Sequence, residues 1–83
     1  MYIHLGSDEM LPIGDIIAII NIDPPISNSI KEIIDLAVAE RTLYPICDRE
    51  RAKSLVITTD KIYLSPISTI TLFKRSRIEF GEV

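Results

Sequence analysis

The sequence predicts an α+β fold, in which a small, mostly antiparallel sheet packs against one main amphipathic helix over residues 27–42 and a short C-terminal helix over 67–76. Two observations lead to this class. Short β-branched segments bounded by glycine, proline and polar turn residues are typical of strands. Apolar residues three and four positions apart indicate a helix after a double proline. With 83 residues, the chain suits one small domain. We predict that domain over 1–78, with a loosely ordered tail over 79–83.

Three strands are predicted before the main helix. Residues 2–5 alternate and end at a glycine, and the turn chemistry of 6–9 leads into a second strand over 10–13. Residues 15–22 are apolar on both parities, which is typical of a strand covered on both faces, here by the protein's own helix and by a partner subunit. A helix is the competing interpretation, but the Asp-Pro-Pro at 23–25 ends the segment early and its isoleucines favour a strand.

The main helix carries the clearest periodic pattern in the chain. Ser29, followed three residues later by Glu32, fits a capping box, with Ser27 and Asn28 as alternative caps. The apolar residues at i, i+3, i+4 and i+7 predict a buried stripe. They are Ile30, Ile33, Ile34 and Ala37.

The C-terminal half predicts three strands and the second helix. Residues 43–47 form a strand whose proline suits a sheet edge, and 54–58 and 62–64 form a hairpin. Residues 48–53 therefore connect two strands at an exposed rim. Ser68 is the expected cap of the second helix. Its predicted apolar face consists of Ile67, Ile70 and Phe73.

Composition favours a soluble, cytoplasmic protein. A single cysteine, Cys47, allows no internal disulfide and suits a reducing compartment. The longest aliphatic run, Ile16–Ile20, is too short to cross a bilayer. Residues 1–20 carry acids rather than the basic start of a secretory signal. We therefore expect no association with a membrane.

Residues suited to catalysis or metal binding are few. His4 lies in an alternating segment, and nothing in the sequence places it beside Cys47 as a base for a nucleophile. Asp8 and Glu9, adjacent acids in a glycine turn, are more often solvated than metal-bound. The sequence contains no phosphate-loop, zinc-ligand or nucleophile-elbow motif. We predict no enzymatic activity, no cofactor and no metal.

Charge is distributed unevenly along the chain, although the net charge is only −3. Residues 1–40 carry seven acids and one base, whereas residues 41–77 carry eight bases and three acids. Such polarity indicates either a nucleic-acid surface or two faces that meet in an oligomer. The alternative without a binding function is a set of solvated surface cations that form weak, exposed ion pairs.

The basic residues predict phosphate contacts rather than base reading, since no helix-turn-helix, zinc-finger or RNA-stacking motif accompanies them. Arg49, Arg51 and Lys53 are spaced by two, so an extended segment would place them on one face, with Asp48 and Glu50 on the other. Further candidates are Arg41, Lys61 and the reserve group Lys74, Arg75 and Arg77.

Five short segments stand out together: YIHLG at 2–6, DIIAI at 15–19, KSLVIT at 53–58, YLSPIS at 63–68 and TLFKR at 71–75. Jointly they resemble the RemB-type extracellular matrix regulatory proteins, small bacterial proteins related to the biofilm regulator RemA. The likeness spans nearly the whole chain and preserves the order of the motifs. Each motif alone is weak, but jointly they are specific.

The resemblance implies a non-enzymatic, DNA-binding transcription regulator of matrix genes that assembles into rings. Arg49 and Arg51 match the basic segment that the family uses for DNA. Double-stranded DNA, further copies of this chain and a RemA-type regulator are the implied partners. The surplus apolar strand surface is then expected at the subunit interface, through Ile16, Ile17, Ile19 and Ile20.

Two positions depart from the family pattern. Asp15 stands where RemA-type chains have a strand-start arginine that helps bind DNA, and Glu50 interrupts their arginine pair. Both acids oppose phosphate binding. The alternative hypothesis is therefore a structural or protein-interaction oligomer that modulates a partner regulator without binding DNA.

Overall fold

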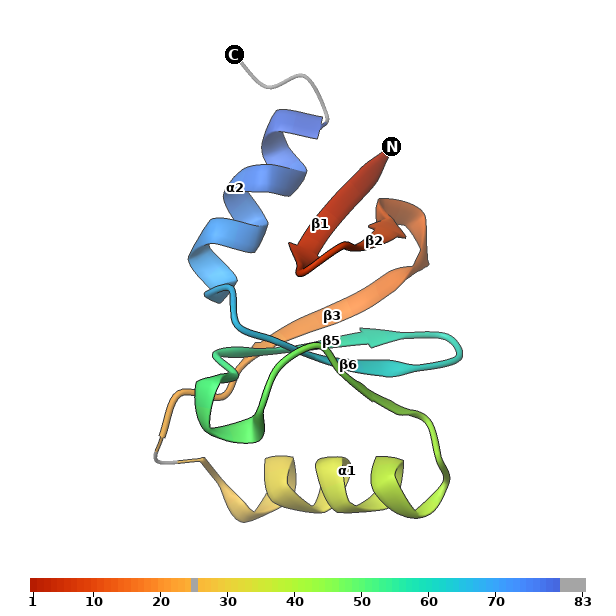
Figure 1. Cartoon of the computed structure of the whole chain (residues 1–83), viewed down its shortest axis with the longest axis vertical. Helices are drawn as coiled ribbons and strands as arrows, with labels where there is room; N and C mark the ends of the chain where they lie inside the picture. Colours follow the sequence, from red (N-terminus) through yellow and green to blue (C-terminus); the bar gives the residue numbers. More distant parts are fainter. Residues whose placement is uncertain (25, 80–83) are drawn as a thin grey trace.

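The computed structural model describes residues 1–24 and 26–79, with the backbone alone for 77–79. Its elements form three layers: α1 on one side, a four-stranded sheet in the middle, and the β1–β2 hairpin with α2 on the other side (Figure 1). This confirms the predicted α+β class. The elements are β1 (Tyr2–Gly6), β2 (Glu9–Pro12), the 3-10 turn η1 (Ile13–Asp15), β3 (Ile16–Asn21), α1 (Asn28–Ala39), β4 (Leu43–Pro45), the 3-10 turn η2 (Arg49–Arg51), β5 (Ser54–Thr58), β6 (Ile62–Ser65) and α2 (Thr69–Glu79).

The central sheet has the strand order β3-β5-β6-β4. β5 runs antiparallel to both β3 and β6, so the predicted hairpin over β5 and β6 is confirmed. β4 pairs in parallel with β6 at the edge of the sheet, where its proline costs no ladder hydrogen bond in the sheet interior. The β1–β2 hairpin forms a separate two-stranded antiparallel sheet.

Alternation along β5 and β6 divides the apolar interior into two clusters, one on each face of the sheet. Val56 and Tyr63 face the hairpin and α2, where they pack with Ile3, Leu5 and Leu72. The neighbouring residues on the same strands face α1. This second cluster contains Ile22, Ile34, Ala52, Leu55 and Leu64.

β3 contributes to both clusters, as its apolar pattern on both parities predicts. Ile19 packs against the first cluster and Ile20 against the second. The chain therefore packs against both faces of β3: α1 lies on one side, as predicted, and the β1–β2 hairpin with α2 lies on the side that the prediction gave to a partner subunit. The covering is incomplete, since none of the six β3 residues is fully buried. Ile17, at a bulge opposite β5, is 64% exposed.

α1 begins two residues earlier than the predicted capping box places it. The Ser27 hydroxyl accepts a hydrogen bond from the Ile30 N–H at 3.2 Å, so the N-cap is Ser27, one of the two alternative caps, and not Ser29 of the capping box. The helix ends at Ala39, three residues before the predicted end. It ends there because Arg41 adopts a left-handed φ of 60°, a conformation that terminates helices.

Two buried serines join the layers of the fold: Ser65 attaches the β1–β2 hairpin to β6, and Ser54 attaches the segment before α2 to β5. The Ser65 hydroxyl donates to the Leu5 carbonyl at 2.7 Å and accepts from the Ile67 N–H at 3.1 Å. The Ser54 hydroxyl donates to the Ile67 carbonyl at 2.7 Å. Gly6, at a φ of 113°, leaves room for Pro66, which a Cβ would approach within 3.1 Å. The YIHLG and YLSPIS motifs therefore meet in space.

α2 exposes two of the three residues that the sequence predicts as its apolar face. Ser68 caps the helix as expected, accepting from the Thr71 N–H at 3.3 Å. However, Leu72 is the fully buried residue, while Ile70 and Phe73 are 66% and 51% exposed. The prediction is wrong for Ile70 and Phe73, whereas Ile67 packs against the first cluster, because the side of the helix that carries Leu72 and Arg75 packs on the hairpin. Residues 80–83, which belong to the predicted loose tail, lie outside the described residues.

Candidate nucleic-acid interface

The basic segment between β4 and β5 forms a single 3-10 turn, η2, rather than an extended strand. The Arg51 N–H donates to the Asp48 carbonyl at 2.9 Å, and the Ala52 N–H donates to the Arg49 carbonyl at 3.3 Å. A 3-10 turn rotates by about 120° per residue. Arg49 and Arg51 therefore point in different directions, and not along one face as an extended segment would place them. The predicted connection between two strands over 48–53 is confirmed.

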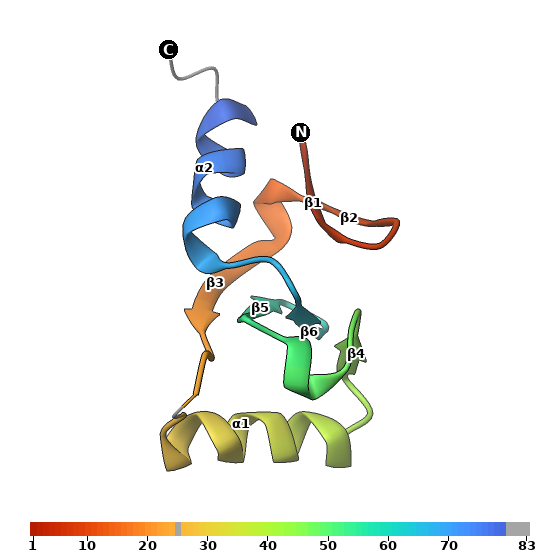
Figure 2. The same ribbon diagram turned by 60° about the vertical axis from the view of Figure 1, so that its left-hand side comes forward.

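The turn is nevertheless held firmly on the sheet. Ala52 is buried in the second cluster. The Lys53 N–H donates to the Ser65 carbonyl at 2.8 Å, and the Lys53 carbonyl accepts from the Ile22 N–H at 3.1 Å. Figure 2 shows η2 between the sheet and α1. The backbone at Lys53 is thus hydrogen-bonded both to β6 and to the segment after β3.

The three turn cations, Arg49, Arg51 and Lys53, are exposed. In the described part of the chain, no side-chain hydrogen bond or ion pair engages them. Their positive charges are therefore available to an anion. Glu50 lies among them and reduces the local positive potential.

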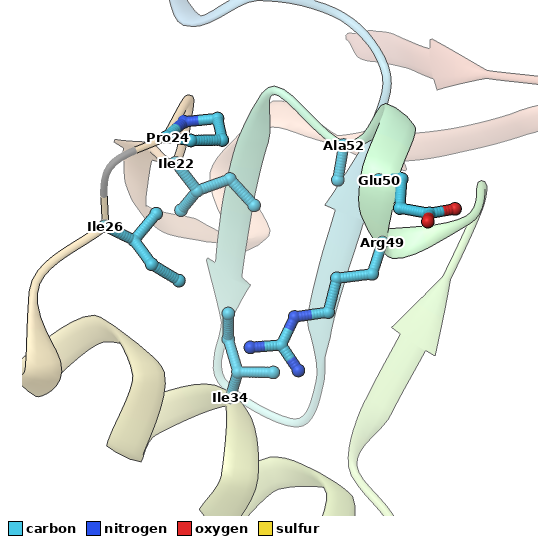
Figure 3. Close-up of a pocket in the computed structure, with 7 residues that line it drawn as sticks. All are labelled: Ile22, Pro24, Ile26, Ile34, Arg49, Glu50 and Ala52. Atoms are coloured by element: carbon cyan, nitrogen blue, oxygen red, sulfur yellow. The ribbon is translucent and has the colours of Figure 1, made fainter.

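Arg49 differs from the other two cations in its surroundings. Its guanidinium points toward Ile34 of α1, whereas Glu50 points away (Figure 3). A pocket of about 140 Å³ lies beside the Arg49 side chain. Its lining residues are Ile22, Pro24, Ile26, Ile34, Arg49, Glu50 and Ala52. Sequence reasoning missed this pocket, because isolated isoleucines around a double proline carry no recognisable signal.

The reserve cations lie on α2, apart from the turn. Ser54 and Ile67 are hydrogen-bonded, so η2 neighbours the start of the helix, whereas Lys74 and Arg75 lie a turn further along it. Lys74 is exposed. Arg75 already makes one hydrogen bond within the protein, because its Nη1 donates to the His4 carbonyl at 2.9 Å. The Arg77 side chain lies outside the described residues.

Lys61 does not join the turn cations. It lies at the opposite end of β5 and β6 from η2, with its Nζ 4.5 Å from the centre of the Tyr44 ring. That ring lies 5.6 Å from the ring of Tyr63, and burial raises the pKa of the Tyr63 phenol. Arg41 terminates α1. Lys61 and Arg41 therefore lie in separate local environments and are not part of the group at η2.

Asp15 is also remote from η2. Ile16 pairs with Thr58, and Asn21 pairs with Ser54, so Asp15 and η2 lie at opposite ends of the β3–β5 ladder. Of the two acids that depart from the family pattern, only Glu50 is therefore close to Arg49 and Arg51 within one subunit.

The candidate nucleophile and base are not paired in the structure. The His4 ring nitrogen Nε2 lies 2.7 Å from the Ser7 carbonyl. Burial raises the pKa of the Cys47 thiol, the nearby Asp48 raises it further, and Arg51 lowers it; the net upward shift favours the protonated, unreactive form.

Among the described residues, no group of three acids, histidines or cysteines is placed to hold a metal. None of their helices is long and apolar enough to span a membrane.

The fold and the anchored basic turn define a small α+β domain with an exposed candidate binding surface. Residues 2–76 match the family described as RemA-like, extracellular matrix regulatory protein A-like. The chain is 35% identical over 80 residues to Extracellular matrix regulatory protein B of Bacillus subtilis (strain 168), an alignment that covers 96% of this chain and 95% of that protein. The chain therefore belongs to the RemA-like family of extracellular matrix regulatory proteins. This confirms the resemblance and supports a regulatory role.

Proposed function

We propose that this protein is a non-enzymatic, homo-oligomeric regulator of extracellular matrix genes that binds double-stranded DNA through its phosphate backbone. The observation that carries the proposal is the η2 turn in a member of this family: Arg49, Arg51 and Lys53 are exposed and, within residues 1–24 and 26–79, have no acid partner, on a backbone fixed to the sheet. A fixed backbone lowers the entropy that phosphate binding costs.

Divergent directions of Arg49 and Arg51 suit contacts to separate phosphates better than contacts to one base edge. Three cations in one subunit are a weak site, but a ring repeats them, and repeated contacts along one duplex multiply affinity. Ring assembly is thus part of the proposal. DNA binding also places the protein in the cytoplasm.

Exposed apolar side chains support the assembly. β3 is an edge strand, and its neighbour α2 shows outward-facing apolar residues too. The most exposed of these are Ile17, Ile70 and Phe73. Burying such side chains stabilises a contact by roughly 25 cal/mol per Å². We place the subunit interface at the predicted residues Ile16, Ile17, Ile19 and Ile20, extended by the exposed face of α2.

A second function remains open to test. Glu50 beside the turn arginines and the net charge of −3 favour an oligomer that acts on a RemA-type partner protein without binding DNA itself. In that case the turn cations contact acidic groups of the partner.

Fluorescence anisotropy of a labelled duplex, titrated at low and at physiological salt, tests the DNA proposal. We expect the double variant Arg49→Ala, Arg51→Ala to bind more weakly, with the slope of log affinity against log salt reduced by roughly 0.9 per lost phosphate contact. The matched control is Arg41→Ala, Lys61→Ala, which removes the same charge away from η2. Equal losses in both variants contradict a site at η2. No binding by the unaltered protein at low salt favours the second function.

A further inference from the structure

The pocket beside Arg49 has the composition of a small-ligand site. Three of its walls are apolar side chains of different elements: Ile22 after β3, Ile34 on α1, and Ala52 after η2. Pro24 and Ile26 close the side between β3 and α1. Its volume of about 140 Å³ is close to that of an engineered apolar cavity that holds a benzene molecule, roughly 150 Å³.

The pocket has a single cationic group. The Arg49 guanidinium reaches into it above Ile34, while the Glu50 carboxylate points away (Figure 3). In the described residues no acid pairs with Arg49. A guanidinium beside apolar walls is complementary to a ligand that has one anionic end and a short apolar body, since its fork binds a carboxylate through two parallel hydrogen bonds.

We propose that this pocket binds a small carboxylate of about six carbons in all, with an apolar body beyond the carboxylate, and that the bound ligand regulates the DNA contact. The carboxylate pairs with Arg49, and the apolar body displaces water from Ile22, Ile34 and Ala52. This regulation rests on the proposed function, because Arg49 is one of the phosphate-binding residues proposed above. A guanidinium held in the pocket is withdrawn from DNA, so the ligand acts as an antagonist.

Amide chemical shifts in a titration with hexanoate test the pocket without DNA. We expect saturable binding in roughly the millimolar range, which burial of a short chain supports, with shifts concentrated at Ile22, Ile26, Ile34 and Ala52. Acetate, which lacks the chain, and hexanol, which lacks the charge, are expected to bind at least about tenfold more weakly.

Two variants of the same turn provide a matched comparison. Arg49→Ala is expected to weaken hexanoate binding by about tenfold or more, whereas Arg51→Ala, outside the pocket lining, leaves it unchanged. Both residues are exposed, so neither variant threatens folding. Equal losses in the two variants, or hexanol binding as tightly as hexanoate, overturn the carboxylate site. If hexanoate dissociates the assembly, the pocket is occupied by a carboxylate of a neighbouring subunit that hexanoate displaces. That result also overturns the proposal.

Competition against labelled DNA tests the regulatory part. Hexanoate is expected to lower the DNA affinity of the unaltered protein several-fold and to have no effect on Arg49→Ala; an equal effect on both overturns the antagonism. The two proposals fail separately. DNA binding without hexanoate binding leaves the proposed function intact and removes the ligand site. Hexanoate binding without DNA binding retains the pocket and removes the DNA function.

Discussion

At the scale of single residues, the buried hydroxyl of Ser65 connects two parts of the chain that are 60 positions apart. It is fully buried, donates to the Leu5 carbonyl and accepts from the Ile67 N–H. Its removal leaves a buried carbonyl and an amide without their partner, and unsatisfied buried groups are costly. Ser54 is equally buried, but its hydroxyl makes a single hydrogen bond, which it donates to the Ile67 carbonyl.

We expect Ser65→Ala to lower the free energy of unfolding by about 1–3 kcal/mol, measured by urea denaturation. Ser54→Ala is the control for removing a buried hydroxyl from the same sheet, and a smaller loss is expected from it. If Ser54→Ala costs as much as Ser65→Ala, the link from Ser65 to Leu5 does not stabilise the attachment of the hairpin.

At the scale of elements, the start of α1 shows how a local signal is decided by the path of the chain. Ser27 and Ser29 are both acceptable caps in sequence. The path from β3 brings the chain into an extended conformation at Ser27, with a ψ of 159°, and helical geometry begins at the next residue. Ser29 is thereby placed in the first turn, where its backbone is already helical.

We expect Ser27→Ala to destabilise the protein by about 1 kcal/mol, through loss of the hydrogen bond to the Ile30 N–H. Ser29→Ala is expected to be neutral or slightly stabilising, since alanine is the better helix former. Thermal denaturation followed by circular dichroism compares the two. A larger loss in Ser29→Ala would return the cap to the capping box.

At the scale of the whole molecule, the exposed apolar residues of β3 and α2 point to assembly. A domain of this size buries little surface for its length and gains stability from oligomerisation. β3 has neither charge nor proline among its six residues, the features that usually protect an edge strand from pairing with another chain. The bulge at Ile17 instead turns one apolar side chain outward.

We expect Ile17→Lys to convert the assembly into smaller species, because a lysine at an edge strand opposes both apolar contact and strand pairing. Light scattering after size exclusion measures the mass. Leu36→Lys, at an equally exposed position on α1, is the control and is expected to leave the mass unchanged. A monomer in the unaltered protein contradicts the assembly altogether, and dissociation by Leu36→Lys alone moves the interface to α1.

Local patterns predicted the elements well where the pattern and the packing agree. The β5–β6 hairpin, the Ser68 cap and the double covering of β3 follow from turn residues, a hydroxyl at a helix start and apolar residues on both parities. The pattern failed for α2, where two of the three apolar positions at helical spacing, Ile70 and Phe73, are exposed and only Ile67 packs against the core. Periodicity shows that a helix has an apolar side, but the neighbouring hairpin determines which side is buried.

The sequence by itself determined the α+β class, the family and the identity of the basic residues, because these depend on residue types, spacing and motif order. Only the tertiary structure decided how those residues are arranged. Turning residues 49–51 into a 3-10 helix separates Arg49 from Arg51, and packing of α1 under the sheet creates the pocket into which Arg49 points. Both outcomes depend on contacts between distant segments, β3, α1 and η2, whose meeting in space is not written in any local pattern.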